Sequence, residues 1–200
     1  MSGTTVMAIG GFRDNAELIV ACRDLGYIAG DVLDPTYGLG RFWSRWEPAG
    51  LTATDLDFDK GRDGTADFTE LPFCSSSFDT VVFDPPYKLN GTGGSHASDA
   101  AYGVANSVRW QDRMRLCRDG ITEAVRVLRP GGHLLVKCQD QVCSGKVRWQ
   151  SIDFSMHGIG LGLQLVDRLE LVSYRPQPAG RRQVHARRNH STMLVLRRSA

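Results

Sequence analysis

The sequence predicts an α/β domain with a mostly parallel sheet, on three observations. Short apolar runs alternate with longer amphipathic stretches along the chain, as strands alternate with helices. Turns that contain glycine or proline separate many of these runs, which marks where elements end. The last two apolar runs have no helix pattern between them, so we expect a C-terminal antiparallel hairpin. The 200 residues are enough for one domain with a substantial core, and we expect a single domain over 1–200.

The first half of the chain begins with an N-terminal helical segment, 1–29. Its helix is expected over 15–25, where apolar residues recur on one face, with Asp14 as N-cap and Gly26 at the end. The clearest strand is 78–83, which is β-branched and apolar. Other elements expected here are strands at 31–34 and 51–54, a weak strand at 65–67, and a helix over 41–46.

Two long connections characterise the second half of the chain, 88–106 and 175–190. Connections of this length are usually functional or disordered, so both are candidate substrate loops. The remaining elements expected are helices over 110–128 and 148–157 and strands over 133–138, 163–174 and 192–197.

The composition excludes several classes of protein. The net charge of +2 excludes a polycation, so any affinity for nucleic acid has to come from a local patch. Five scattered cysteines without a C-x-x-C pair suggest neither a disulfide framework nor a metal site. We find no signal-peptide pattern and no apolar run of membrane-spanning length. We therefore expect a reduced, cytoplasmic protein without a membrane partner.

A glycine-containing loop, 34–40, lies between the first strand and the next expected helix. Its glycines allow the backbone to turn sharply and approach a ligand, and a helix N-terminus offers unpaired N–H groups. The third glycine of a dinucleotide fingerprint is missing, which disfavours NAD. An ordinary strand-to-helix turn is the alternative. The candidate ligand-binding residues here are Asp34, Pro35, Thr36, Gly38 and Gly40.

Acidic residues follow the next two expected strands. Asp55 is placed to accept hydrogen bonds from both hydroxyls of a ribose, although a solvated turn is the alternative and Asp57 and Asp59 lie close by. Asp67 could read the amino edge of an adenine while Phe68 packs on its face. A strand-end turn is the alternative there.

Asp84-Pro85-Pro86-Tyr87 is the most informative motif. Two prolines cannot continue a central strand, so they form a rigid exit at the carboxyl end of strand 78–83, where open α/β sheets bind ligands. Such an exit would aim Asp84 and the Pro85 carbonyl at one point, with Tyr87 as a stacking surface. Two acceptors that hold the hydrogens of an exocyclic amine would localise its lone pair for attack on a methyl donor. A plain Pro-Pro turn is the alternative.

These motifs resemble those of amino-methyltransferases that act on DNA. The 34–40 loop is similar to their S-adenosyl-L-methionine loop, and Asp84-Pro85-Pro86-Tyr87 to their catalytic motif, in the same order along the chain. Residues 128–137 also resemble the turn and fifth strand of class I methyltransferases. The resemblance implies a Rossmann-like fold with seven mostly parallel strands, a C-terminal antiparallel hairpin and helices on both faces. It also implies S-adenosyl-L-methionine as cofactor and, from Asp84 at the first position, adenine N6 in DNA as target.

Other functions remain open at this point. The same motif resembles that of RNA guanine-N2 methyltransferases, so RNA guanine-N2 or adenine-N6 methylation is an alternative. Protein-amide methyltransferases prefer Asn where this chain has Asp84. A catalytically idle nucleic-acid-binding module with this fold is the alternative outside enzymes. No Pro-Cys pair is present, which argues against cytosine-C5 chemistry, since that reaction needs a thiolate.

Basic residues suggest where nucleic acid binds. The chain has little room for a separate recognition region, so a separate partner that supplies specificity is one expectation. Five arginines lie in the 175–190 loop, which is consistent with binding phosphates, and a solvated basic loop is the alternative. Lys137, at the end of strand 133–138, either lines the cleft or has a structural role. The candidate nucleic-acid-binding residues are Lys88, Arg181, Arg182, Arg187 and Arg188.

Overall fold

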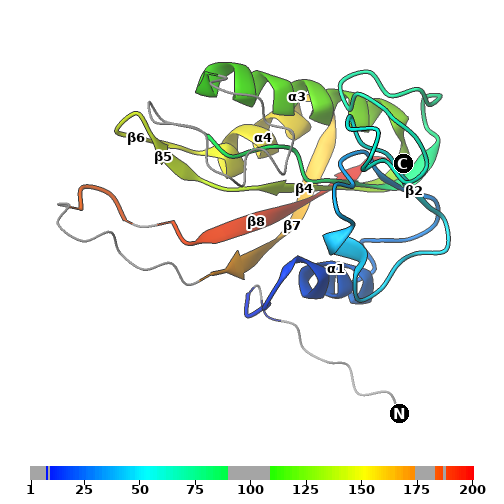
Figure 1. Ribbon diagram of the computed structural model, residues 1–200, viewed down its shortest axis with the longest axis horizontal. Coiled ribbons are helices and arrows are strands. Elements are labelled where there is room, and N and C mark those ends of the chain that lie inside the picture. Colours follow the sequence, from blue (N-terminus) through cyan, green and yellow to red (C-terminus); the bar gives the residue numbers. More distant parts are fainter. Residues whose placement is uncertain (1–7, 9, 90–108, 174–182, 187) are drawn as a thin grey trace, which may run out of the picture.

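The computed structural model describes residues 8, 10–89, 109–173, 183–186 and 188–200. Within them, one mixed sheet of six strands has the order β2-β1-β3-β4-β8-β7, with helices on both faces (Figure 1). The strands of this sheet are β1 (Val32–Asp34), β2 (Leu51–Ala53), β3 (Phe78–Phe83), β4 (Leu128–Cys138), β7 (Leu163–Val172) and β8 (His190–Arg198).

The helices are α1 (Asn15–Asp24), α3 (Trp110–Val127) and α4 (Gln150–Gly160). α1 begins as predicted, because the side chain of its N-cap Asp14 accepts from the Glu17 N–H at 2.9 Å. Figure 1 shows α1 on one face of the sheet and α3 with α4 on the other. No helix in the described residues is both long and apolar enough to cross a membrane.

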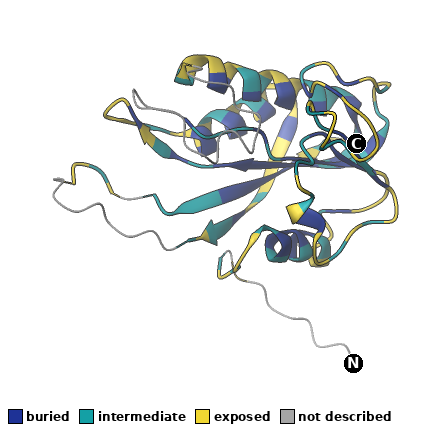
Figure 2. Cartoon of the chain, in the orientation of Figure 1, coloured by how far each residue is buried: buried dark blue, intermediate teal, exposed yellow. Residues whose placement is uncertain are grey.

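The sheet is buried on both faces, which gives the domain two apolar clusters. On β3, Val81 and Phe83 face the cluster that contains Ile121 of α3. Val82 lies between them in sequence and faces the other cluster, with Ile19 of α1. All three strand residues are fully buried, and Figure 2 shows buried residues along the centre of the sheet. Because side chains alternate between the two faces of a strand and both faces are covered here, the segment Val81-Val82-Phe83 is apolar throughout.

Strand pairing confirms a parallel sheet with a C-terminal antiparallel hairpin. β1 is parallel to β2 and to β3, and β3 is parallel to β4. β8 is antiparallel to β4 and to β7. The carboxyl ends of β1, β2 and β3 therefore meet at one edge of the sheet, where parallel α/β sheets bind their ligands.

The expected strand at 65–67 does not form, which leaves six strands in this sheet rather than seven. These residues contribute only isolated bridges. Carboxylates here and just upstream bind nearby backbone N–H groups instead: Asp55 accepts from Asp57 at 2.9 Å, and Asp67 accepts from Thr69 at 2.8 Å. Such local bonds compete with a strand ladder, so this part of the chain makes turns.

Two further expectations differ from the structure. The helix expected over 41–46 is only a short 3-10 helix, η1 (Arg41–Trp43). Pro48 follows closely in the sequence, and a proline disfavours helical backbone at the residue before it. A small hairpin that we did not expect, β5 (Gln141–Cys143) with β6 (Lys146–Arg148), follows β4. Its two turn residues, Ser144 and Gly145, both have positive φ, +52° and +72°, as tight hairpin turns require.

Candidate functional site

A cavity of about 590 Å³ lies where β1, β2 and β3 end. This volume is within the range of small-molecule sites, roughly 300–1,000 Å³. The cavity brings together residues from three loops that are far apart in the sequence. Of the predicted ligand-binding residues, Asp34, Pro35, Thr36, Gly38, Asp55, Asp67 and Phe68 line it, whereas Gly40 does not.

Asp34 shapes the 34–40 loop from inside the protein. Only 3% of its surface is exposed, and both of its carboxylate oxygens accept hydrogen bonds. Oδ1 accepts from the Thr36 N–H and hydroxyl, at 2.9 and 3.2 Å, and Oδ2 accepts from the Trp43 indole N–H at 2.8 Å. Burial raises the pKa of Asp34 to about 7. Its carboxyl group therefore holds the turn after β1 in place.

Gly38 and Asp55 connect this loop to the end of β2. Gly38 has a φ of +57°, which favours glycine, and its N–H donates to Asp55 Oδ2 at 2.9 Å. Asp55 Oδ1 accepts from the Asp57 N–H at 2.9 Å. Each carboxylate oxygen retains a second acceptor position. Asp55 can therefore hold the loop and still bind a ligand, while the Asp57 carboxylate pairs with Lys60 at 2.8 Å.

Asp67 and Phe68 form another wall of the cavity. The Asp67 carboxylate accepts from the N–H and hydroxyl of Thr69, at 2.8 and 2.7 Å. The Phe68 ring packs edge-on against Phe83 with centroids 5.2 Å apart, and only 9% of Phe68 is exposed. Phe68 is therefore a core residue that also reaches the cavity.

The strip Asp84-Pro85-Pro86-Tyr87 leaves β3 beside the cavity. Asp84 and Pro86 line the cavity, whereas Pro85 and Tyr87 do not. Asp84 Oδ1 is buried and has no hydrogen-bond partner in the described part of the chain, and burial raises the pKa of Asp84. A buried acceptor without a donor costs free energy. The site thus presents an acceptor that a ligand donor could satisfy.

Glutamine side chains fix the backbone just after this strip. The Tyr87 carbonyl accepts from Gln141 Nε2 at 3.0 Å and from Gln150 Nε2 at 2.6 Å. Gln141 Oε1 also accepts from the Leu89 N–H at 3.1 Å. The Pro85 carbonyl, predicted as the second acceptor for a substrate, already accepts from the Tyr87 N–H at 2.6 Å. The strip is therefore held by the β5–β6 hairpin and by α4.

Lys137 places a buried positive charge next to the cavity. Its side chain is 1% exposed, and Nζ donates to Asn15 Oδ1 at 2.6 Å and lies 5.6 Å from the Phe42 ring centroid. Burial lowers the pKa of Lys137, and the charge of Asp84 opposes that change. Lys137 in turn lowers the pKa of Asp84 against the effect of burial. Lys137 does not itself line the cavity, but it contacts Asn15 and Phe42, which do.

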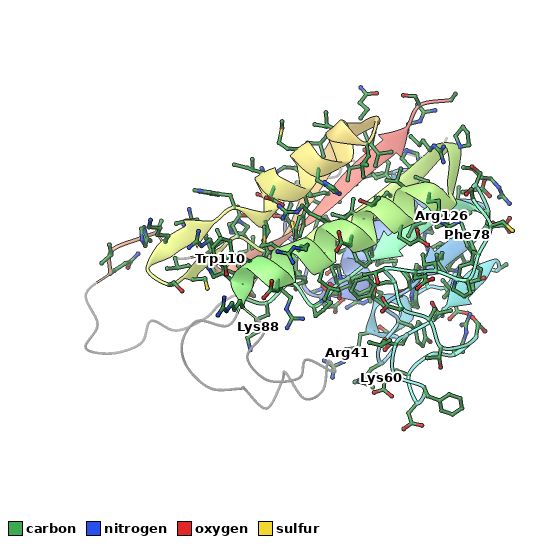
Figure 3. The ribbon with its side chains drawn as sticks, turned by 90° about the horizontal axis from the view of Figure 1, so that it is seen from above. Arg41, Lys60, Phe78, Lys88, Trp110 and Arg126 are labelled. Atoms are coloured by element: carbon green, nitrogen blue, oxygen red, sulfur yellow. The ribbon has the colours of Figure 1, made fainter. Side chains whose placement is uncertain are left out.

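Several lining residues were not predicted. Asn15 comes from the first turn of α1, and Arg113, which is 4% exposed, comes from α3. Arg41 and Lys60 add positive charge to the loops, and Figure 3 labels both. An amphipathic helix pattern gives no sign that one of its polar residues faces a ligand, so the sequence carried no signal for Asn15 or Arg113.

Two of the predicted nucleic-acid-binding residues, Lys88 and Arg188, lie in the described part of the chain, and neither lines the cavity. Lys88 directly follows the strip and is partly exposed; Figure 3 shows it near the start of α3. The Arg188 guanidinium lies 4.5 Å from the Trp149 ring centroid. Arg181, Arg182 and Arg187 lie outside the described residues.

Comparisons by sequence find no match, whereas comparisons by structure find several. No protein-family model matches the chain, and no curated protein matches it. The chain spans about half the length of a candidate DNA modification methylase of Thermus thermophilus, solved with S-adenosyl-L-methionine. That match has 19% identity and a TM-score of 0.48, and it covers 68% of this chain and 54% of the other.

Two other structures match nearly the whole chain. A candidate methyltransferase of Bacillus halodurans is 14% identical, with a TM-score of 0.57 over 91% of this chain and 99% of the other. The [4+2]-cyclase SpnF is 12% identical, with a TM-score of 0.56 over 92% of this chain and 80% of the other. Because a cyclase shares the fold, the reaction has to be argued from the site. The chain has the α/β Rossmann-like methyltransferase fold, with a mostly parallel sheet and antiparallel C-terminal strands.

Proposed function

We propose that this protein is an S-adenosyl-L-methionine-dependent methyltransferase that acts on the exocyclic amino group of a nucleobase, with adenine N6 in DNA as the favoured target. One observation supports this most strongly. Asp84, which lines the cavity where β3 ends, has a buried Oδ1 without a hydrogen-bond partner in the described residues. An amino group is a donor that would satisfy this acceptor.

The cavity residues fit the cofactor by charge and by shape. S-adenosyl-L-methionine has a sulfonium, an ammonium and a carboxylate, so its site needs groups of both signs. Asp55 and Asp84, where β2 and β3 end, supply negative charge, and Arg41 supplies positive charge. The 34–40 loop would hold the methionine part, Asp55 the ribose hydroxyls, and Asp67 with Phe68 the adenine. When bound, the cofactor supplies an electrophilic methyl group.

The chain's own residues would orient the amine. An exocyclic amine is a poor nucleophile because its lone pair is delocalised into the ring. Asp84 would accept a hydrogen bond from one N–H and so localise the lone pair, which requires the carboxylate form. Lys137 lowers the pKa of Asp84 against the effect of burial and so favours that form. Tyr87 would stack on the base once it has left its helix.

The alternatives differ in substrate or in activity. RNA guanine-N2 or adenine-N6 methylation would use the same strip, and Asp84 in place of Asn disfavours a protein amide. An idle binding module would gain nothing from a buried carboxylate oxygen that has no donor among the described residues, since such a group destabilises the fold. The site therefore favours an enzyme.

Transfer of a radiolabelled methyl group to DNA, total RNA and protein, followed by nucleoside analysis, tests the proposal. We expect label in N6-methyladenosine from DNA, and none with Asp84→Asn. Label in RNA nucleosides alone would move the target to RNA. Cofactor binding without transfer to any of these polymers would contradict the proposed activity.

A further inference from the structure

Arginine side chains stack on tryptophan rings around the β5–β6 hairpin. The Arg148 guanidinium lies 3.7 Å from the Trp110 ring centroid, and that of Arg188 lies 4.5 Å from the Trp149 ring centroid. Trp149 is 47% exposed, so part of its ring is open to a partner. We call these four residues, with Lys146 of β6, the hairpin surface.

The β5–β6 hairpin, which carries part of the hairpin surface, is tied to the catalytic strip by hydrogen bonds. Gln141, in β5, donates to the Tyr87 carbonyl at 3.0 Å and accepts from the Leu89 N–H at 3.1 Å. The other end of the hairpin meets the segment before β8, because a ring nitrogen of His185 lies 3.0 Å from the Gly145 carbonyl oxygen. Figure 1 shows the hairpin at the end of the molecule where β8 begins. A polymer on this surface would therefore lie next to Tyr87.

The hairpin surface carries positive charge without matching acids. Neither 141–150 nor 183–190 contains an Asp or Glu. Two nearby acids are already engaged: Asp140 accepts from the N–H and hydroxyl of Ser151, both at 2.9 Å, and Asp153 pairs with Arg118 at 3.2 Å. In the described residues, no carboxylate forms an ion pair with Lys146, Arg148 or Arg188.

Stacking suits these arginines to bind phosphate. A guanidinium over an aromatic ring still has N–H donors in its own plane, which match the oxygens of a phosphate. One Arg148 donor, Nε, is buried and has no hydrogen-bond partner in the described residues. The partly exposed Trp149 adds an aromatic ring to the same surface. Cations interleaved with aromatic rings beside a positively charged segment are typical of surfaces that track a nucleic-acid strand.

We propose that the hairpin surface binds the sugar–phosphate backbone of the nucleic-acid substrate and guides the target base to Tyr87. This inference builds on the proposed function, because it names the surface that holds the proposed polymer. An acidic peptide could neutralise the same charges, but it would have no flat base to place on Trp149. Nucleic acid is therefore the partner that uses both the arginines and the exposed ring.

The binding test compares two double variants of equal charge. Lys146→Gln with Arg148→Gln removes two cations from the hairpin surface, and Arg13→Gln with Arg197→Gln removes two exposed cations elsewhere. Anisotropy of a fluorescein-labelled single-stranded oligonucleotide of mixed sequence is titrated at several salt concentrations. We expect the hairpin variant to bind about tenfold or more weakly, with a salt slope smaller by about 0.7 per lost phosphate contact on a single strand. The control variant should bind like the wild type.

A second measurement keeps the test valid if the hairpin variant is unstable. Oligonucleotide binding should quench tryptophan fluorescence in the wild type, and Trp149→Phe should remove most of that quenching while leaving cofactor affinity unchanged by calorimetry. Equal binding by the two double variants, or full quenching in Trp149→Phe, would overturn the inference. So would equal competition by poly-glutamate and by the oligonucleotide.

Failure of this inference can be told apart from failure of the proposed function. If the wild type and the hairpin variant methylate the oligonucleotide equally and bind it equally, the inference is wrong and the activity stands. If the wild type binds the oligonucleotide through this surface but transfers no methyl group, the inference stands and the proposed activity is wrong.

Discussion

The Thr36 hydroxyl accepts a hydrogen bond from the Asp84 backbone N–H at 2.9 Å. This bond joins the 34–40 loop directly to the catalytic strip, although the two are far apart in the sequence. The same hydroxyl lies 3.2 Å from Asp34 Oδ1, to which it donates. One side chain thus fixes the distance between the loop that would hold the cofactor and the residue that would orient the amine.

Thr36→Val should uncouple these two loops. The change keeps the shape but leaves the Asp84 N–H without an acceptor, which costs about 1–3 kcal/mol if it stays buried. We expect weaker cofactor binding by calorimetry and slower methyl transfer. Thr36→Ser keeps the hydroxyl and should stay close to wild type. Equal behaviour of the two variants would show that the bond has no role in the site.

Asp84→Asn and Asp84→Ala should separate chemistry from cofactor binding. Asparagine keeps the shape but loses the charge and can present an N–H donor, and alanine removes the acceptor. We expect methyl transfer to fall by roughly 10²–10⁴-fold, the usual contribution of a positioned proton acceptor. Cofactor affinity should change little because other residues make those contacts. Near-full activity of Asp84→Ala would exclude the mechanism.

Lys137→Met should change the pH dependence of methyl transfer. Lys137 lowers the pKa of Asp84, so its loss raises that pKa further. If transfer requires the Asp84 carboxylate, the acid limb of the pH–rate profile moves to higher pH in Lys137→Met. Lys137→Arg keeps the charge and serves as the control. A lower rate with an unmoved acid limb would mean that Lys137 only supports the packing around Asn15.

Asp34 should make the folded protein less stable as pH rises. Burial raises its pKa from 3.8 to about 7, so within that interval the folded state holds a proton that the unfolded state has released. Stability from this group is therefore present below pH 3.8 and is lost as pH rises towards about 7. Urea unfolding across this interval should show a smaller loss for Asp34→Asn, which does not titrate. If the free energy of unfolding fell equally with pH in both proteins, this assignment would be refuted.

Gly120→Ala should destabilise the domain although alanine is the better helix former. A Cβ at Gly120 would lie 2.5 Å from Phe83 Cζ and 2.7 Å from Phe68 Cδ2, and overpacking of this kind typically costs about 1–3 kcal/mol. Gly160→Ala is the matched control, since a Cβ there meets no atom within 4 Å. Urea unfolding should show a loss for Gly120→Ala and none for Gly160→Ala. Similar midpoints would mean that α3 shifts to make room.

Local signals explain what the sequence predicts well. β3 ends in the apolar run Val81-Val82-Phe83, which is buried on both faces, and two prolines follow Asp84, so both the strand and the position of the strip could be read directly. Asp34 and Asp55 likewise follow short apolar runs. Their placement at one edge of the sheet follows from parallel pairing.

Contacts between distant residues could not be predicted in this way. Lys137 meets Asn15 across more than half of the chain, and neither residue type indicates the other. Residues 65–67 gave only a weak strand signal, and the nearby carboxylates of Asp55 and Asp67 bind the local backbone instead.

The β5–β6 hairpin, by contrast, did have a local signal that we did not use, the turn residues Ser144-Gly145.

The parallel pairing of β1 has a consequence for how the protein folds. Val32 pairs with Leu51 on one side and with Thr80 on the other, so chain segments well separated in sequence must meet before the edge that carries the cavity exists. Closing such loops costs entropy before any contact offsets it, and domains rich in non-local pairing fold more slowly than helical ones of similar size. We therefore expect the helices to gain structure early in refolding and the ligand-binding edge to be completed last.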